Sequence, residues 1–398
     1  MTAELRAAFL DDLAGPERPL DAEWWSAFRD VPRDLFVPYF FVPLTDRPGW
    51  RLVEHPNPEW TRRVWSNDPL ITQLDGNDQH AAAARRGEVV NGVSTSSSSA
   101  PSLMALMLQA LDVHDDEHIL EIGTGTGYNT ALLCHRLGSD SVTSVDVDAC
   151  VIDRARGCLA DLGYAPTLAA ADGVRGYAAR APFDRILATV AAPSVPAAWL
   201  AQTRDGGKIL FPLDLRNCGG LLPLLTVQGS RAQGHFLPDY GGFMPFRQDR
   251  PDTALKAFYD NEHHDGTPRA TRLPADIIQA TPFEYFAALM VGGTDWMEFI
   301  PNDGSPAQAW IAQADGSWVC HITEPDGTHT IREGGPTRIW TRIEQARQLW
   351  DNLGQPPRER LGLTATPDEL VVWLDDPNAS NRWTLDTEGR GALGLCRS

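Results

Sequence analysis

The stretch EIGTGTGY, residues 121–128, places three glycines at alternating positions between two different hydrophobic patterns. The residues HILEIG, at 118–123, form a short apolar run that predicts a buried strand. The residues YNTALLCHRLG, at 128–138, predict a helix that ends at a glycine. Because glycine has no Cβ, its backbone can pass close to a ligand. A glycine turn between a strand and a helix is therefore typical of a cofactor-binding α/β domain.

Strand and helix patterns alternate on both sides of this turn. A helix is predicted at 101–111, where leucine and methionine recur at helical spacing and Pro101 occupies the first turn. Further strands are predicted at 141–148, 166–173, 183–190 and 207–213, and a further helix at 149–163. This alternation predicts an α/β fold with a doubly wound sheet.

Acidic residues follow two of the predicted strands. Asp146 lies about twenty residues beyond the glycine turn, where a carboxylate can accept hydrogen bonds from ribose hydroxyls, and Asp172 ends the next strand. The GxGxG spacing differs from the GxGxxG of dinucleotide-binding proteins, so it disfavours a nicotinamide dehydrogenase without excluding one. A purely structural turn would not need three alternating glycines.

The serine run VSTSSSSAP, residues 93–101, leads directly into the predicted helix at 101–111. Serine runs are usually solvated linkers, and composition alone favours that interpretation. The position ahead of a helix favours a second interpretation, because the free N–H groups at a helix start attract anions. The run is therefore either a linker or part of an active site.

The motifs LEIGTGTGY, VDVD and ADG resemble those of S-adenosylmethionine-dependent methyltransferases. VPRDLFVP, WSNDPLITQ, Ser99-Ala100-Pro101, APFDRILATVAAPSVPAAWLAQ and GGKILFPL then occur in the order found in protein-L-isoaspartate O-methyltransferases, over roughly residues 20–215. The resemblance implies a Rossmann-like methyltransferase sheet with helices on both faces and S-adenosyl-L-methionine as cofactor. It also implies a methyl-accepting carboxylate near the Ser-x-Pro turn.

The resemblance assigns roles to individual residues. Ser99 matches the active-site serine, and Ser98 and Ser97 are the neighbouring catalytic candidates. The implied cofactor-binding residues are Ser99, Glu121, Gly123, Thr124, Gly125, Gly127, Tyr128, Asn129, Asp146, Val147, Asp172 and Gly173. A carboxylate with a pKa of about 3.9 is ionised at neutral pH, so its methylation by a sulfonium needs orientation rather than a general base. We therefore favour a carboxylate-orienting turn over a linker for the serine run.

The sequence departs from the family pattern after Ser-x-Pro. The family usually has an aromatic residue or histidine there, whereas this chain has Ser102, Leu103 and Met104. These residues, the extra serines and a long C-terminal extension resemble the branch that modifies ribosomally made lanthipeptides, lasso peptides and graspetides. That branch implies methylation of an aspartate, which then becomes an aspartimide or isoaspartate. We predict a precursor peptide as the partner; protein-L-isoaspartate repair is the alternative, and a non-catalytic peptide-binding module is the second alternative.

Composition shifts predict three parts of the chain. Residues 1–90 form an N-terminal helical and family-specific segment, in which the alanine-rich stretch at 78–87 is a surface excursion. Residues 91–249 form the S-adenosylmethionine-binding core. Residues 250–398, rich in tryptophan and Asp-Gly turn pairs, form an added C-terminal α+β domain for peptide recognition.

The overall composition narrows the partners and the location. The chain has 398 residues, of which 42% are hydrophobic, and a net charge of −19. An acidic surface repels phosphates, so neither nucleic acid nor an anionic membrane is expected as a partner. Six cysteines without a CxxC pair, and no signal peptide or apolar run of about 20 residues, predict a cytoplasmic protein. No metal site is predicted, and the oligomeric state is not indicated.

Overall fold

The chain divides into two units, each described here by itself. The computed structural model describes residues 2–13, 20–215, 220–247, 266–279, 281–300, 305–385 and 392–395. Unit 1 comprises Met1–Val190, Pro196–Leu210 and Thr226–Gly229, and unit 2 comprises Ala191–Val195, Phe211–Leu225 and Ser230–Ser398. The expected domain boundaries at residues 90 and 250 stay predictions about independently folding parts, since these units divide the chain at other positions.

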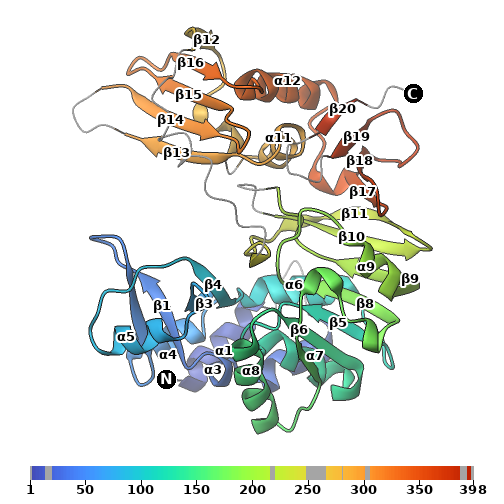
Figure 1. Cartoon of the computed structure of the whole chain (residues 1–398). Helices are drawn as coiled ribbons and strands as arrows, with labels where there is room; N and C mark the ends of the chain where they lie inside the picture. The colour runs from blue at the N-terminus through green and yellow to red at the C-terminus, as the bar shows by residue number, and fades with distance from the viewer. Residues whose placement is uncertain are drawn as a thin grey trace. The chain divides into compact units, whose positions relative to one another are not determined.

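A parallel sheet forms the centre of unit 1 (Figure 1). Its strands are β5 (Ile119–Ile122), β6 (Val142–Asp146), β7 (Thr167–Ala170), β8 (Phe183–Ala188) and β9 (Thr203–Leu210), in the order β9-β8-β5-β6-β7. All neighbouring pairs run parallel. Every residue of β5 and β8 is buried, as expected for strands covered on both faces. The predicted α/β fold with a parallel sheet is confirmed.

Helices precede and connect these strands, and some of their ends have a clear local reason. They are α6 (Pro101–Leu111), α7 (Tyr128–Leu137), α8 (Ala149–Asp161) and α9 (Ala197–Gln202), with the 3₁₀ turns η1 (Ser139–Ser141), η2 (Gly173–Arg175) and η3 (Ala178–Arg180). The Asp148 carboxylate caps α8 by accepting hydrogen bonds from the N–H groups of Cys150 and Val151. Gly138, with a φ of 81°, ends α7 as the sequence predicts. Helices α7 and α8 both contact β6.

The N-terminal residues form more than the predicted helices. The helices are α1 (Thr2–Leu13), α2 (Ala22–Asp30), α3 (Arg33–Phe36), α4 (Pro58–Val64) and α5 (Gln79–Arg85). The strands β1 (Tyr39–Pro43), β2 (Trp50–Glu54), β3 (Leu70–Leu74) and β4 (Ser94–Ser98) form a separate sheet in the order β2-β1-β3-β4. A helical description of residues 1–90 was therefore incomplete, because short strands between prolines and turns give little periodic signal. The stretch at 78–87 is exposed or half-buried apart from Ala81, in line with a surface excursion, and it contains α5, which packs Ala81 against Phe41 and Leu74.

Unit 2 contains two groups of antiparallel strands. One group is a sheet of β12 (Arg269–Thr271), β13 (Asp295–Phe299), β14 (Ala307–Ala312), β15 (Trp318–Thr323) and β16 (His329–Gly334), in the order β12-β16-β15-β14-β13. The other group comprises β10 (Leu221–Gln228), β11 (Arg231–Tyr240), β17 (Leu361–Ala365), β18 (Leu370–Leu374), β19 (Arg382–Leu385) and β20 (Ala392–Leu395), in the order β20-β19-β18-β17-β11-β10. The last three residues of β10, from Thr226 to Gln228, are assigned to unit 1. The hairpins β14–β15 and β15–β16 turn at the Asp-Gly pairs, as the sequence predicts.

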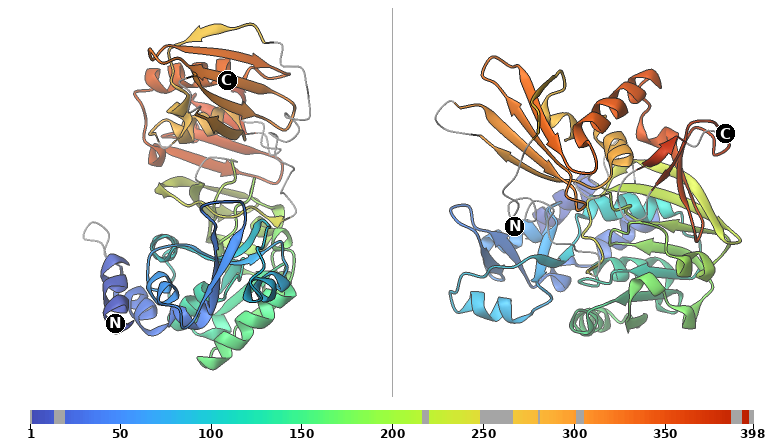
Figure 2. Two further views of the ribbon diagram at one scale, coloured as in Figure 1. Left: turned by 90° about the vertical axis from the view of Figure 1, so that its left-hand side faces the viewer. Right: turned by 45° about the horizontal axis from the view of Figure 1, so that its top comes forward.

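Helices of unit 2 complete the predicted α+β character. They are α11 (Glu284–Val291) and α12 (Ile339–Asn352), with the 3₁₀ turns η5 (Ala275–Ile278) and η6 (Arg358–Arg360). Helix α12 contacts β15, β16 and α11, and the views in Figure 2 show it beside the sheet of β12–β16. Trp340, Trp373 and Trp383 are each at most 2% exposed, so these tryptophans belong to the core of the unit.

The helices can also be compared with the dimensions of a membrane. Within the described ranges, none combines the length and the apolar character that a bilayer crossing requires.

Gly127 provides a test of the packing beneath the glycine turn. Its φ is 86°, and a Cβ added there would lie 2.9 Å from Ala155 Cβ of α8. Gly163 has a similar φ of 77°, but an added Cβ would meet nothing within 4 Å. Gly127→Ala is therefore expected to lower the free energy of unfolding by about 1–3 kcal/mol more than Gly163→Ala, because overpacking adds to the backbone strain that both share. Urea unfolding measures both variants, and equal losses would contradict the close packing of α7 on α8.

Candidate functional site

The glycine turn lies at the carboxyl edge of the parallel sheet. Gly123, Gly125 and Gly127 have φ values of 99°, 52° and 86°, a region that side chains disfavour. The N–H of Gly123 donates to the carbonyl oxygen of Val145 at 2.8 Å, which fixes the turn to the end of β6. The turn therefore lies beside the point where the strand order reverses, between β5 and β8, which is where ligands bind in open α/β sheets.

The three glycines have different neighbours. An added Cβ would lie 2.8 Å from Thr189 Oγ1 at Gly123 and 2.9 Å from Ala155 Cβ at Gly127, so these two glycines permit close packing. At Gly125 the nearest atom would be the carbonyl oxygen of Ser97, at 3.4 Å. The middle glycine thus faces the serine run, and the structure brings together the two motifs that the sequence singles out.

The serine run is a strand rather than a linker or a turn over most of its length. β4 pairs antiparallel with β3, with Ser98 opposite Leu70 and Ser97 opposite Ile71. The side chains alternate as in any strand: Ser96 and Ser98 are 6% and 2% exposed, whereas Ser97 and Ser99 are partly exposed. Only Ser99 and Ala100 connect the strand to α6. The sequence analysis did not predict this strand, because serine has little intrinsic preference for the β conformation.

The alternation separates the predicted catalytic serines. The hydroxyl of Ser98 accepts a hydrogen bond from Arg33 Nε at 3.2 Å, and the hydroxyl of Ser96 accepts one from Thr72 at 3.2 Å. These two side chains therefore support the strand from the inside. The side chains of Ser97, in β4, and of Ser99, directly after it, lie on the more exposed face.

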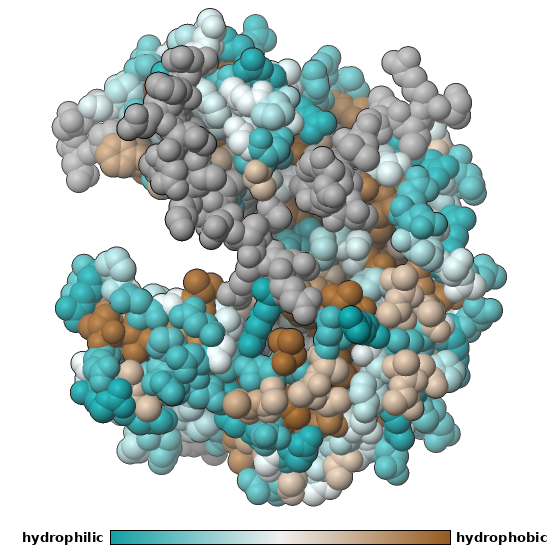
Figure 3. All heavy atoms as spheres, viewed as in Figure 1, coloured by the Kyte–Doolittle hydropathy of each residue, from teal (hydrophilic) through white to brown (hydrophobic). Residues whose placement is uncertain are grey.

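Asp146 lies at the end of β6, next to the turn. Its carboxylate accepts hydrogen bonds from the N–H of Gly125 at 3.0 Å and of Asp148 at 3.1 Å. The next side chain, Val147, is 49% exposed. On the face of the molecule that Figure 3 draws, hydrophobic residues lie in scattered groups among hydrophilic ones. A carboxylate beside an exposed apolar side chain suits a ribose followed by the flat face of a base.

Asp172 and Gly173 follow β7, the neighbour of β6. The carbonyl oxygen of Asp146 accepts a hydrogen bond from the N–H of Ala171 at 2.8 Å, which holds the two strand ends together. The carboxylate of Asp172 accepts from the N–H of Val174 at 3.0 Å, and the carbonyl oxygen of Gly173 accepts from Trp199 Nε1 at 2.8 Å. Because Asp146 ends β6 and Asp172 follows the carboxyl end of its parallel neighbour β7, both predicted acidic residues lie along one edge of the sheet.

Glu121 supports the turn from below. Its side chain is completely buried, and its carboxylate accepts hydrogen bonds from Asn129 Nδ2 at 2.7 Å, Thr130 Oγ1 at 2.5 Å and Ser144 Oγ at 2.6 Å. Burial raises the pKa of the Glu121 carboxyl, and the three donors oppose that rise. Thr124 joins the same network through Ser144 at 2.7 Å. Glu121, Asn129 and Thr124, which the resemblance assigns to cofactor contacts, therefore have side chains within the protein.

Tyr128 also points away from the turn. It is 3% exposed, and its ring contacts Phe28 and Phe36 at centroid distances of 6.3 Å and 5.8 Å. Its hydroxyl is buried with no hydrogen-bond partner among the described residues, and burial raises its pKa. The side chain therefore packs under helices α2 and α3, and only the backbone of Tyr128 remains near the turn.

Three residues that the sequence analysis did not single out support this site. Thr189, just after β8, donates its hydroxyl hydrogen to the carbonyl oxygen of Gly123 at 2.7 Å. Gln73, 1% exposed, accepts from Thr95 at 3.0 Å and donates to the Asp148 carboxylate at 3.0 Å, which links β3 and β4 to the start of α8. Arg33 is the third. The strand-end rule that identifies Asp146 would have found Thr189, whereas Gln73 and Arg33 act across long stretches of sequence.

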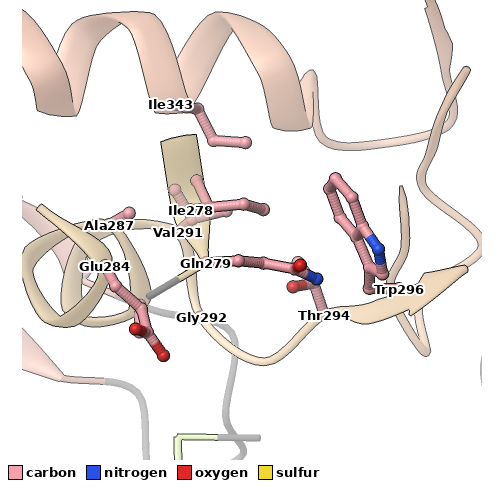
Figure 4. A pocket seen from close by; sticks show the side chains of 10 residues that line it. Ile278, Gln279, Glu284, Ala287, Val291, Gly292, Thr294, Trp296 and Ile343 are labelled. Atoms are coloured by element: carbon pink, nitrogen blue, oxygen red, sulfur yellow. The ribbon is translucent and has the colours of Figure 1, made fainter. Parts of the chain in front are cut away.

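Unit 2 has a hollow of its own (Figure 4). It has a volume of about 440 Å³, part of which is open solvent. Ala287 and Val291 of α11 and Ile343 of α12 line it with apolar surface, and Thr294 and Trp296 lie on one side. The remaining lining residues are Ile278, Gln279, Glu284, Ala288 and Gly292. An apolar hollow with a few polar groups and an indole is suited to a side chain of a peptide.

Residues 85–224 match the model of the family described as protein-L-isoaspartate(D-aspartate) O-methyltransferase. The chain is similar to the protein-L-isoaspartate O-methyltransferase of Myxococcus xanthus, with 40% identity over 137 residues, 34% of this chain and 63% of that protein. The enzyme of the same name from Syntrophus aciditrophicus is 39% identical over 130 residues, 32% of this chain and 59% of that protein. The chain thus spans about three fifths of the length of these curated relatives.

A solved structure named protein-L-isoaspartate O-methyltransferase has the same fold over most of the chain. It covers 92% of this chain and 96% of its own, with a TM-score of 0.51 and 21% identity. These matches confirm the predicted fold and the resemblance of residues 85–224 to this family. The names of the relatives favour isoaspartate repair over the predicted precursor-peptide aspartate.

The buried carboxyl of Glu121 predicts a pH-dependent stability. Because its pKa is raised in the folded state, its contribution to stability is complete below the unfolded pKa of about 4.3 and is lost as pH rises through the folded value. Glu121→Gln removes this titration. The unfolding free energy of the wild type minus that of the variant is therefore expected to fall as the pH rises above about 4.3. The fall amounts to about 1.4 kcal/mol for every tenfold by which folding increases the proton affinity of the carboxylate.

Urea unfolding at a series of pH values measures this difference. Asp153→Asn is the control, because the Asp153 side chain on α8 is 79% exposed. A wild-type minus Glu121→Gln difference that stays constant with pH would contradict a raised pKa at Glu121.

Proposed function

We propose that this chain, whose residues 85–224 match the model of the protein-L-isoaspartate(D-aspartate) O-methyltransferase family, transfers a methyl group from S-adenosyl-L-methionine to the carboxylate of an isoaspartyl residue. The observation that carries the proposal is the contact between the glycine turn and the serine strand. A Cβ added at Gly125 would lie 3.4 Å from the carbonyl oxygen of Ser97. A turn suited to the methyl donor thereby lies next to a segment suited to a carboxylate.

The residues at the sheet edge fit the proposed cofactor. When bound, S-adenosyl-L-methionine supplies an electrophilic methyl group on a sulfonium. Gly125 allows backbone approach, Asp146 accepts from ribose hydroxyls, and Val147 offers an apolar surface to the base. Glu121, Thr124 and Asn129 serve indirectly in this proposal, since their side chains hold the turn.

The serine segment would orient the acceptor. A carboxylate is already ionised at neutral pH, so the protein does not need to remove a proton from it. The Ser99 hydroxyl and nearby N–H groups can donate hydrogen bonds that aim one oxygen at the methyl carbon, and such alignment is a large part of catalysis. Methyl transfer gives a neutral ester and a neutral thioether from a carboxylate and a sulfonium, so a dry site favours it.

A second candidate is the predicted methylation of an ordinary aspartate in a ribosomally made precursor peptide. The observation that favours it is the departure at Ser102, Leu103 and Met104, which changes the residues just behind the proposed carboxylate segment. Unit 2 alone does not favour it, because the solved structure of similar length carries the isoaspartate methyltransferase name. The ester would lose methanol to form an aspartimide, a net loss of one water from the peptide.

One experiment separates these functions. The full chain is incubated with methyl-labelled S-adenosyl-L-methionine and two peptides that differ only in carrying isoaspartate or aspartate at one position. Methylation of the isoaspartyl peptide alone supports the first proposal. Labelling of the aspartyl peptide, or mass loss of one water from a constrained aspartyl peptide, supports the second. No transfer to either peptide, with intact peptide binding, would leave the non-catalytic alternative.

The cofactor prediction concerns Asp146. Asp146→Ala is expected to weaken binding of S-adenosylhomocysteine by about 1–3 kcal/mol, because hydrogen bonds to a charged acceptor are lost. Calorimetry measures the affinity. Asp153→Ala, at an exposed position on the following helix, is the matched control and should bind as the wild type does. Tight NADH binding without any response to S-adenosylhomocysteine would contradict the proposed cofactor.

The acceptor prediction concerns Ser99. Ser99→Ala is expected to lower kcat about tenfold or more while the affinity for S-adenosylhomocysteine stays close to that of the wild type, because the hydroxyl orients the acceptor. Steady-state kinetics with the labelled peptide measure kcat. Ser94→Ala, at the other end of β4, is the control. Unchanged turnover in Ser99→Ala would move the role to Ser97 or Ser102.

The peptide-recognition role proposed for unit 2 predicts an effect of Trp296. Trp296→Ala is expected to raise KM for a peptide substrate about five- to thirtyfold without a change in kcat, because aromatic anchors supply much of the binding energy in such hollows. Phe299→Ala, on the same strand but 59% exposed and outside the hollow, is the control. Equal KM values for both variants and the wild type would argue against recognition at this hollow.

A further inference from the structure

Arg33 is a buried charge with an unusual set of partners. It is the first residue of α3 and is 0% exposed. Its guanidinium makes six contacts with oxygen atoms, and none of them is a carboxylate among the described residues. The acceptors are the carbonyl oxygens of Val64 (3.3 Å), Ser66 (2.8 Å), Asp68 (2.8 Å), Ser98 (3.4 Å) and Ser99 (3.2 Å), and the hydroxyl of Ser98 (3.2 Å).

Burying a charge without a counter-ion is expensive, and the hydrogen bonds must offset that cost. Burial lowers the pKa of Arg33 to about 10, which still leaves the guanidinium protonated at neutral pH. A neutral side chain of similar size could fill the same space. The reason for a charged residue here must therefore lie in the groups that the guanidinium binds.

The guanidinium joins two segments of unit 1. One is the loop at 64–68, which follows α4, and the other is the end of the serine strand at 98–99. The same loop also holds the start of α6, because Asn67 Oδ1 accepts a hydrogen bond from the N–H of Ser102 at 2.9 Å. The short connection at Ser99 and Ala100 is thus fixed on both sides.

The direction of these contacts determines which groups remain available. In a trans peptide unit the C=O and the N–H point in opposite directions. Because the carbonyl groups of Ser98 and Ser99 both point to Arg33, the N–H groups of Ser99 and Ala100 point away from it. Within the part of the chain that the structure describes, no hydrogen bond from either N–H or from the Ser99 hydroxyl is seen.

We propose that Arg33 is a positioning residue: by binding the carbonyl oxygens of Ser98 and Ser99, it presents the N–H groups of Ser99 and Ala100 and the Ser99 hydroxyl as three donors to the acceptor carboxylate. This role rests on the proposed methyl transfer to a carboxylate. The positive charge also polarises both peptide units, and a polarised amide is a stronger hydrogen-bond donor. Arg33 thus acts on the anionic substrate without touching it.

Arg33→Lys tests the proposal in the full-length chain. Lysine keeps the charge but, as a point charge with three donors, cannot bridge the two segments. We expect kcat for the isoaspartyl peptide to fall about ten- to a hundredfold, since small misplacements of oriented groups have effects of that size, with the affinity for S-adenosylhomocysteine within about twofold of the wild type. Hydrogen exchange in residues 98–102 should become faster, because the clamp on this backbone is lost.

Arg185→Lys is the matched control. Arg185 is 4% exposed in the same unit and binds the carbonyl oxygens of Leu111 and Asp112, and it is paired with Glu117 at 3.0 Å. It should lose stability while kcat per folded molecule stays unchanged. If Arg33→Lys does not fold, Ser98→Ala replaces it, because this change removes one guanidinium acceptor without adding volume, and a lower kcat at unchanged cofactor affinity is again expected.

The outcomes are distinguishable. A wild-type chain that methylates neither the isoaspartyl nor the aspartyl peptide overturns the proposed function and the role of Arg33 together. If the wild type is active and the folded Arg33→Lys variant has an unchanged kcat, the role of Arg33 alone is overturned. If the lysine variant does not fold, an unchanged kcat in the folded Ser98→Ala variant overturns it in the same way. A fall in kcat equal to that of Arg185→Lys also overturns it, because the effect would then be a general one of buried arginines.

Discussion

The buried carboxylate of Glu121 is the interaction on which the cofactor end of unit 1 depends. It receives hydrogen bonds from Asn129 and Thr130 of α7 and from Ser144 of β6, so a strand, the following helix and the next strand converge on one group. An incompletely satisfied carboxylate at this depth would be costly, which restricts the network to one arrangement. The glycine turn above it is thereby shaped before any ligand binds, and preorganised groups of this kind need no rearrangement during a reaction.

The second half of the proposed site comes from residues ahead of the segment that matches the family model. That segment begins at residue 85, yet Arg33 and Gln73 hold the serine strand and connect it to Asp148. Hydrogen bonds from these two side chains span 66 and 75 residues of sequence. The N-terminal part of the chain therefore holds the serine strand in place, as the parallel sheet holds the glycine turn.

In the proposed function, unit 2 is assigned to substrate binding rather than to the transfer step. A structure named protein-L-isoaspartate O-methyltransferase shares the fold over nearly its whole length. The apolar hollow between α11, α12 and Trp296 is a place where a peptide side chain can be buried. In the proposed function, the distinction between isoaspartate and aspartate is assigned to the spacing and direction of the donors at Ser99 and Ala100, because both acceptors carry the same charge.

The sequence by itself determined the parallel sheet, the glycine turn and the acidic strand ends, because these follow from local rules: apolar runs of four to six residues, positive φ values at glycine, and the shared edge of parallel strands. It also indicated the α+β character of the C-terminal residues through Asp-Gly turns. Only the tertiary structure decided that four serines lie in a strand, that Ser98 faces inward while Ser99 does not, and that Tyr128 packs away from the turn. These outcomes depend on partners such as Leu70, Arg33 and Phe36, which lie far along the chain, and contacts across such separations leave no periodic pattern in the residues that make them.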